Sequence, residues 1–129
     1  MAETKLRKRS EIPEEYKWKL EDMYETDELW EEEADKLAKL GDEMAQFQGK
    51  LGESASNLLA FMKKKDEISY YIARVIVYSN QRSHQDTAVT KYQGYVAKAE
   101  SVAVGVSSAL AFADPEILSI DAEKMEKFY

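Results

Sequence analysis

Apolar side chains recur along residues 88–109 at alternating steps of four and three positions. The members of this pattern are Ala88, Tyr92, Tyr95, Ala99, Val102, Val106 and Ala109. Such a repeat places all of its members on one side of an α-helix, as in the seam of a helical bundle. Val102, Val104 and Val106 also alternate as in a β-strand, but the longer pattern runs through them. The segment therefore predicts a long helix that packs against other helices.

Three earlier stretches also carry apolar residues at helical spacing, and each follows a residue that can cap a helix. These predicted helices cover residues 26–47, 54–65 and 66–79, with Thr26, Ser54 and Asp66 as N-caps. A turn at Gly49–Gly52 separates the first two, and Lys63–Lys65 forms the last turn of the second. We expect a loop at Gln81–Gln85, a cap at Asp86 for the seam helix, and short helices after Asp114 and over 122–129.

Residues 1–25 show little helical periodicity. Large and charged residues alternate from Tyr16 to Leu20, which favours an extended segment held on one side by Tyr16, Trp18 and Leu20. We therefore predict an all-α fold with two parts. An extended arm over residues 1–25 docks on an antiparallel bundle of about four main helices over residues 26–129, which ends in short C-terminal helices.

Composition narrows the possible partners. The chain has 18 Lys and Arg against 25 Asp and Glu, a net charge of −7, which argues against non-specific nucleic-acid binding. The basic run Lys5–Arg9 is interpreted as a solvated arm rather than a polyanion site. The longest uncharged run, Ser101–Ala113, is shorter than the roughly 20 residues that span a membrane. We expect a soluble, cytoplasmic protein with no nucleic-acid or membrane partner.

Residues able to carry out chemistry are scarce. The chain has no cysteine and one histidine, so it lacks the paired ligands of a zinc helix or a di-metal bundle. His84 adjoins Ser83, but no strand–turn–helix elbow surrounds them, and we interpret His84 as an exposed loop residue. We therefore assign no catalytic, cofactor-binding or metal-binding residue to this chain, and the substrate-binding residues are unknown.

The segment 101–113 is apolar on nearly every face of its predicted helix, which is typical of a helix buried all round. Either Trp18, Tyr24 and Trp30 wrap it, or the natural protein continues and covers it. Phe128 and Tyr129 end the sequence in a predicted helix without a capping glycine, so we expect a longer natural protein. Left uncovered, the segment would allow self-association.

The order of several residues resembles the start of the oligoendopeptidase F family of zinc metallopeptidases, from about Arg9 onward. The early matches are Ile12-Pro13, Tyr16, Trp18, Leu20, Met23-Tyr24, Asp27, Trp30 and the turn Phe47-x-Gly49-Lys50-Leu51. The later matches are Tyr78, Asp86-Thr87, Tyr92-Gln93 and Pro115-Glu116-Ile117-Leu118.

The resemblance implies the N-terminal helical lobe of a larger, mostly helical enzyme that cuts short peptides. In that family the lobe forms a wall or lid of the substrate cleft, and zinc is held by a later His-Glu-x-x-His helix with a further Glu. The resemblance thus implies a partner, the missing C-terminal catalytic domain, which would carry the zinc; this chain alone would be inactive. The alternative is a stand-alone interaction module whose acidic first helix, with nine acids from Glu21 to Asp35, meets a basic partner.

Overall fold

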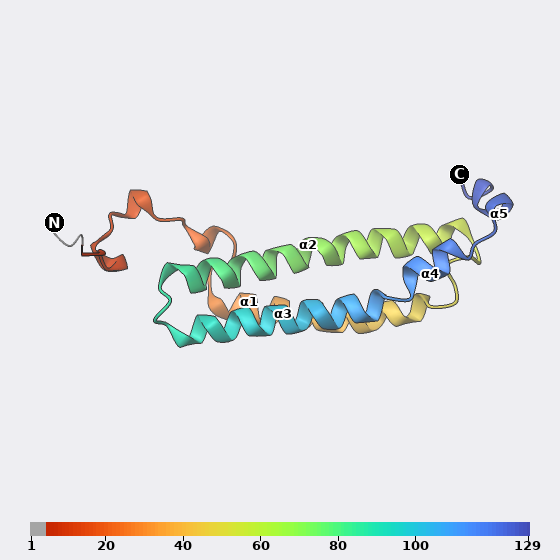
Figure 1. Ribbon diagram of the computed structural model, residues 1–129. Helices are drawn as coiled ribbons and strands as arrows, with labels where there is room; N and C mark the ends of the chain where they lie inside the picture. The colour runs from red at the N-terminus through yellow and green to blue at the C-terminus, as the bar shows by residue number, and fades with distance from the viewer. Residues whose placement is uncertain (1–4) are drawn as a thin grey trace.

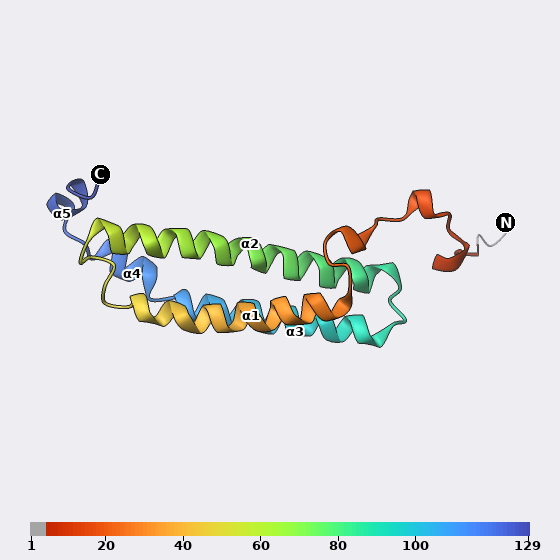
Figure 2. The same cartoon turned by 180° about the vertical axis from the view of Figure 1, so that it is seen from behind.

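Three long antiparallel helices form the body of the molecule (Figures 1 and 2). They are α1 (Asp27–Glu43), α2 (Ala55–Gln85) and α3 (Thr90–Leu110), followed by the short helices α4 (Ala113–Leu118) and α5 (Ala122–Glu126). Four 3-10 turns complete the helical structure: Arg9–Glu11, Glu14–Tyr16, Leu20–Asp22 and Met44–Phe47. The computed structural model describes residues 5–129 and contains no strand in that range. The prediction of an all-α antiparallel bundle is confirmed.

Two predicted helix starts are confirmed by their capping hydrogen bonds. The backbone N–H of Leu29 donates to the Thr26 hydroxyl at 3.3 Å, and that of Asn57 donates to the Ser54 hydroxyl at 3.1 Å. Each bond satisfies a donor that the first helical turn would leave unpaired. Between these helices, Gly49 adopts a φ of 80°, which glycine reaches without steric cost. The turn predicted there is therefore also confirmed.

The boundary predicted at Lys63–Asp66 is wrong, because α2 runs through it without a break. Phe61, Ile68 and Val75 are seven residues apart and all lie buried, so one stripe crosses the predicted break. No glycine or proline lies inside α2 to end the helix. For the same reason Gln81–Gln85 is the last part of α2 instead of a loop.

The later boundaries also differ from the predictions. Asp86 does not cap α3; its carboxylate accepts a hydrogen bond from the Ala88 N–H at 3.0 Å in the connecting turn, and α3 begins at Thr90. In the same way α4 begins at Ala113, one residue before the predicted cap Asp114. The last helix, α5, ends at Glu126, and a turn bond from the Phe128 N–H to the Met125 carbonyl follows it.

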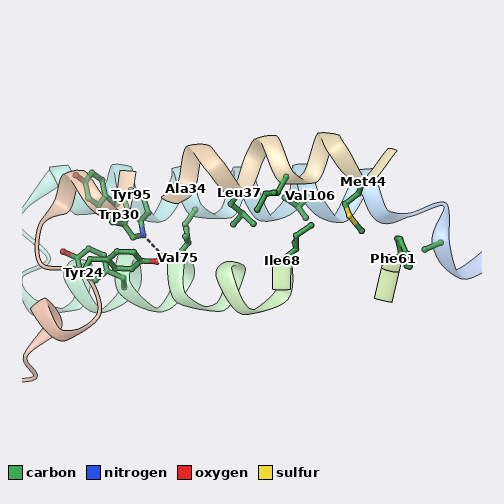
Figure 3. Close-up of a cluster of buried hydrophobic side chains, with 14 of the residues drawn as sticks. Tyr24, Trp30, Ala34, Leu37, Met44, Phe61, Ile68, Val75, Tyr95 and Val106 are labelled. Atoms are coloured by element: carbon green, nitrogen blue, oxygen red, sulfur yellow. Dashed lines mark hydrogen bonds between the residues drawn. The ribbon is translucent and has the colours of Figure 1, made fainter. Parts of the chain in front are cut away.

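The core runs along the axis of the bundle (Figure 3). Trp30, Tyr24 and Tyr95 lie at one end, and Met44 and Phe61 lie at the other. The middle contains Leu37, Ile68 and Val106, which come from α1, α2 and α3 and are almost completely buried. Because each long helix supplies one stripe, the three helices close around a single apolar interior.

The N-terminal arm contributes to the buried core only through its final part. Leu20 and Tyr24 are buried, each 5% exposed, whereas Tyr16 is 75% and Trp18 84% exposed. The expectation that Tyr16 and Trp18 are held against the bundle is therefore wrong. In Figures 1 and 2 the described part of the arm extends past the loop that joins α2 to α3. Tyr16 and Trp18 reach only the end of α2, where they line a small pocket with His84.

Candidate functional site

Several residues that carry the family resemblance meet at one end of the bundle. The rings of Trp30 and Tyr95 stack with centroids 4.2 Å apart, and Tyr24 meets Tyr78 edge-on at 4.9 Å. The Trp30 indole N–H also donates to the Val75 carbonyl oxygen at 2.9 Å. Aromatic pairs and a satisfied indole stabilise packing beyond the buried area alone. This aromatic cluster therefore joins α1, α2, α3 and the end of the arm.

Asp27, at the start of α1, is the centre of a polar network beside this cluster. Its carboxylate accepts hydrogen bonds from the Tyr78 hydroxyl at 2.8 Å, the Tyr92 hydroxyl at 2.9 Å and the Lys91 ammonium at 3.0 Å. Desolvation raises the pKa of Asp27, but the hydrogen bonds from Lys91, Tyr78 and Tyr92 outweigh it, and the pKa lies below 3.8. The ionised carboxylate thus connects all three long helices.

The side chains around Asp27 also make hydrogen bonds to other residues. The Arg82 guanidinium donates to the Tyr78 hydroxyl at 3.0 Å, and burial raises the pKa of Tyr78 to about 12. Tyr95 donates to Glu31, and Tyr24 donates to Glu33. No buried side-chain nitrogen or oxygen in the described part of the chain lacks a partner. A reactive group needs a donor or acceptor that is free to bind substrate. Because the groups of this network are bonded to one another, the network serves to hold the helices together.

At the other end of the bundle, two further resemblance motifs meet. The Glu116 carboxylate, on α4, accepts hydrogen bonds from the backbone N–H groups of Gly49 and Leu51, both at 2.8 Å. Charge-assisted bonds of this kind are among the stronger ones in proteins. Pro115-Glu116 and the glycine turn are separate signals in the sequence, because their contact spans more than sixty residues and has no local pattern.

An acid-lined pocket lies between the arm and α1, with a volume of about 790 Å³. Its charged lining is Glu21, Asp22, Glu25, Glu32, Glu33, Lys36 and Arg74. Arg74 crosses its base, where its guanidinium donates to the Met23 carbonyl at 2.8 Å and lies 4.8 Å from the centre of the Tyr24 ring. Among residues 5–129, no three His, Asp or Glu side chains converge to hold a metal ion. His84 is exposed on the last turn of α2, not in a loop.

The outward face of α3 is uncovered. Tyr95, Ala99 and Val106 turn inward and are buried, whereas Val104 on the opposite side is 66% exposed. The stretch Thr90–Leu118 is long and apolar enough to cross a membrane, with a mean hydropathy of 1.3 over its most apolar 18 residues, and only 17% of that window is buried. One such helix is weak evidence of a membrane span, because core helices share this composition. Trp18, which is 84% exposed, does not cover residues 101–113, and the buried Trp30 lies on the core side of α3.

A second open surface is an apolar groove of about 360 Å³ beside the start of α2. It is lined by Ala55, Leu58, Leu59, Met62, Ile117, Met125, Phe128 and Tyr129. Leu59 is 55% exposed there, and the neighbouring Leu118 is 85% exposed. The described part of the chain thus has two open apolar surfaces, one along α3 and one at the far end of the bundle.

Sequence comparison finds relatives that are named as oligopeptidases or oligoendopeptidases. The chain is 36% identical to the oligopeptidase PepF of Bacillus subtilis over 99% of its own length. It is 35% identical to the group B oligopeptidase PepB of Streptococcus agalactiae and 36% identical to a plasmid-encoded oligoendopeptidase F of Lactococcus lactis subsp. cremoris, in each case over 93% of this chain. The matches cover 20% of each relative, so the chain spans about a fifth of their length. No protein-family model and no solved structure matches the chain.

Proposed function

Since the chain is homologous over nearly its whole length to the oligoendopeptidase F family, we propose that it forms the N-terminal helical domain of a zinc metallopeptidase that hydrolyses short peptides. The observation that carries this proposal is the 36% identity to an oligopeptidase over 99% of the chain. The described residues do not fit a zinc site, because they contain one exposed histidine and no converging set of ligands. In this proposal the metal belongs to the other four fifths of the protein.

We propose that the domain acts as a wall or lid of the substrate cleft. The aromatic cluster with its Asp27 network braces one end of the bundle, and the Glu116 contacts brace the other. A wall that keeps its shape can exclude folded proteins and shelter the reaction from bulk water. Contacts to a peptide away from the cleaved bond would also help to orient it.

The test uses the full-length protein from the natural gene. Quenched fluorescent oligopeptides and a folded protein are offered to three samples: the full-length enzyme, a version that lacks residues 1–129, and the isolated chain. We expect the full-length enzyme to cut only the peptides and to lose activity with a zinc chelator. The truncated enzyme should lose activity or accept larger substrates, and the isolated chain should be inactive. A truncated enzyme with unchanged rate and size selectivity would overturn the lid role.

A second candidate function is a stand-alone interaction module with a basic partner. The acid-lined pocket beside α1 is the observation that favours it, since the ring of carboxylates there would attract cations at low salt. Binding of a short oligolysine to the isolated chain, weakened by added salt and by the double substitution Glu25→Gln/Glu32→Gln, would support this alternative. Absence of binding at low salt would exclude it.

A further inference from the structure

We propose that the outward face of α3 is the packing surface for one helix from the part of the longer protein outside residues 1–129. This open face consists of residues that are all exposed: Gly94, Ala97, Ser101, Val104, Gly105, Ser108 and Ala111. Apart from the adjacent pair Val104 and Gly105, they are spaced by three and four residues, which places them along one side of α3 and its C-cap residue Ala111. The inference rests on the proposed function in one respect, namely that the chain is one part of a longer polypeptide.

The open face lacks the charge that a solvated helix carries. The outward side of α1 carries several exposed charged residues, namely Glu28, Glu32, Asp35, Lys36, Lys39, Asp42 and Glu43. The seven residues of the open face are uncharged, with Lys98 and Glu100 at its two edges, and residues 101–113 contain no charge at all. A helix that is apolar all round is normally buried all round. In Figure 1, α3 runs along the near side of the bundle with α1 behind it, and no described element covers it from the front.

The two glycines of the open face also bear on what packs there. At Gly41 on α1, an added Cβ would lie 2.9 Å from the Cγ2 atom of Val106, so internal packing requires that glycine. At Gly94 and Gly105, an added Cβ would meet nothing within 4 Å. A glycine inside a helix is unfavourable relative to alanine, and the bundle itself gains nothing from these two. They are explained if another backbone approaches the open face closely.

The shape of the open face indicates that its binding partner is a helix and not a lipid surface. Small residues spaced by three and four form a shallow groove that lets a second helix approach closely. Lipid-facing helices instead present large aliphatic side chains, and the opposite side of α3 is fixed in the bundle by Tyr95, Ala99 and Val106. The occupant is available within the same protein, because the relatives are about five times as long as this chain.

The experiment separates the stability of this chain from its docking. The chain 1–129 and the remainder of the protein are produced separately, and their association is measured by calorimetry. Gly105→Leu is compared with Ser69→Leu, which places the same side chain on the exposed side of α2. In the isolated chain, Gly105→Leu should raise the unfolding midpoint by about 3 °C, because leucine favours the helix and nothing obstructs it. Association should weaken at least tenfold for Gly105→Leu, because the new side chain would collide with a closely packed partner helix. Association should remain unchanged for Ser69→Leu.

Three outcomes would overturn the inference: equal association of both variants with the remainder, a dimer of the isolated chain that Gly105→Leu dissociates, or co-sedimentation with lipid vesicles that Gly105→Leu abolishes. The readouts also separate this inference from the proposed function. Equal docking of both variants in a size-selective peptidase overturns the inference alone. Docking that depends on Gly105 in a protein without peptidase activity overturns the proposed function alone.

Discussion

The indole N–H of Trp30 on α1 donates to the carbonyl oxygen of Val75 on α2 at 2.9 Å, in the fully buried centre of the aromatic cluster. That carbonyl lies 45 residues later in the chain. The contact restricts the rotation of α1 against α2, because turning either helix would break a buried hydrogen bond. Trp18, the other tryptophan, is 84% exposed and makes no comparable contact.

The first prediction compares these two tryptophans. Trp30→Phe should lower the free energy of unfolding by about 2 to 4 kcal/mol, since it removes a buried hydrogen bond and leaves a cavity. Trp18→Phe should change it by less than about 0.5 kcal/mol. Urea titrations followed by circular dichroism provide the measurement. Similar losses of stability in both variants would mean that Trp18 is packed against the bundle.

The second prediction concerns the close approach of α1 and α3 at Gly41. Gly41→Ala should destabilise the chain by about 1 to 3 kcal/mol, because the new Cβ collides with Val106 and overpacking outweighs the gain in helix propensity. Gly94→Ala, also inside a helix but open to solvent in this chain, should stabilise it by about 0.5 to 1 kcal/mol. Thermal unfolding of the isolated chain distinguishes the two signs.

The third prediction concerns acid stability. The pKa of Asp27 is lowered in the folded state, so its contribution is complete well above 3.8 and disappears as the pH falls through the folded-state value. Asp27→Asn should cost about 1 to 3 kcal/mol at neutral pH, and its difference from wild type should shrink below pH 3.8. Asp35→Asn, at a carboxylate that is 65% exposed, serves as control and should change stability by less than about 0.5 kcal/mol. A pH-independent difference for Asp27→Asn would contradict the network.

The fourth prediction concerns alkaline pH. Burial raises the pKa of Tyr78 from 10.0 to about 12, with the Asp27 carboxylate adding to the effect and Arg82 opposing it. The stability that Tyr78 contributes is therefore complete below pH 10.0 and is lost as the pH rises through about 12. Tyr78→Phe should make the decline above pH 10.0 less steep, as measured by urea unfolding over this range. Parallel declines in both proteins would count against a buried, neutral Tyr78.

The fifth prediction concerns the link between α4 and the glycine turn. Glu116→Ala should lower stability by about 1 to 3 kcal/mol, since the N–H groups of Gly49 and Leu51 lose a charged acceptor. Amide hydrogen exchange should accelerate more at these two residues than at Trp30 in the distant cluster, where exchange reports only the loss of global stability. Glu123→Ala, at an exposed residue of α5, is the control. Unchanged exchange at Gly49 would show that the turn holds its shape without Glu116.

Sequence periodicity predicted the helices well and their boundaries poorly. The seam in α3 was predicted from spacing alone, and its members Tyr95, Ala99 and Val106 are buried as expected. The break predicted at Asp66 is absent, because a residue that can cap a helix can equally lie inside one. Neighbouring helices settle that choice, since they bury Phe61 and Ile68 on one continuous stripe.

The candidate surfaces were predicted only in part. The excess of apolar residues at 101–113 is visible in the sequence, and so is the acidic start of α1. Their consequences depend on which neighbours are present: Trp18 lies beside the end of α2, and Val104 is 66% exposed. Likewise Asp27 has the appearance of an ordinary first-turn acid, and no local pattern reveals that Tyr78 and Tyr92 converge on it.

The sequence by itself determined the helical class, the two capping residues Thr26 and Ser54, and the relation to a peptidase family, because these depend on residue types and on spacings of a few positions. The tertiary structure alone decided that Asp27 joins three helices, that Glu116 holds a turn far away in the chain, and that one side of α3 stays open. These contacts arise when stripes from distant segments pack together, and packing fixes neighbours that spacing along the chain leaves undetermined.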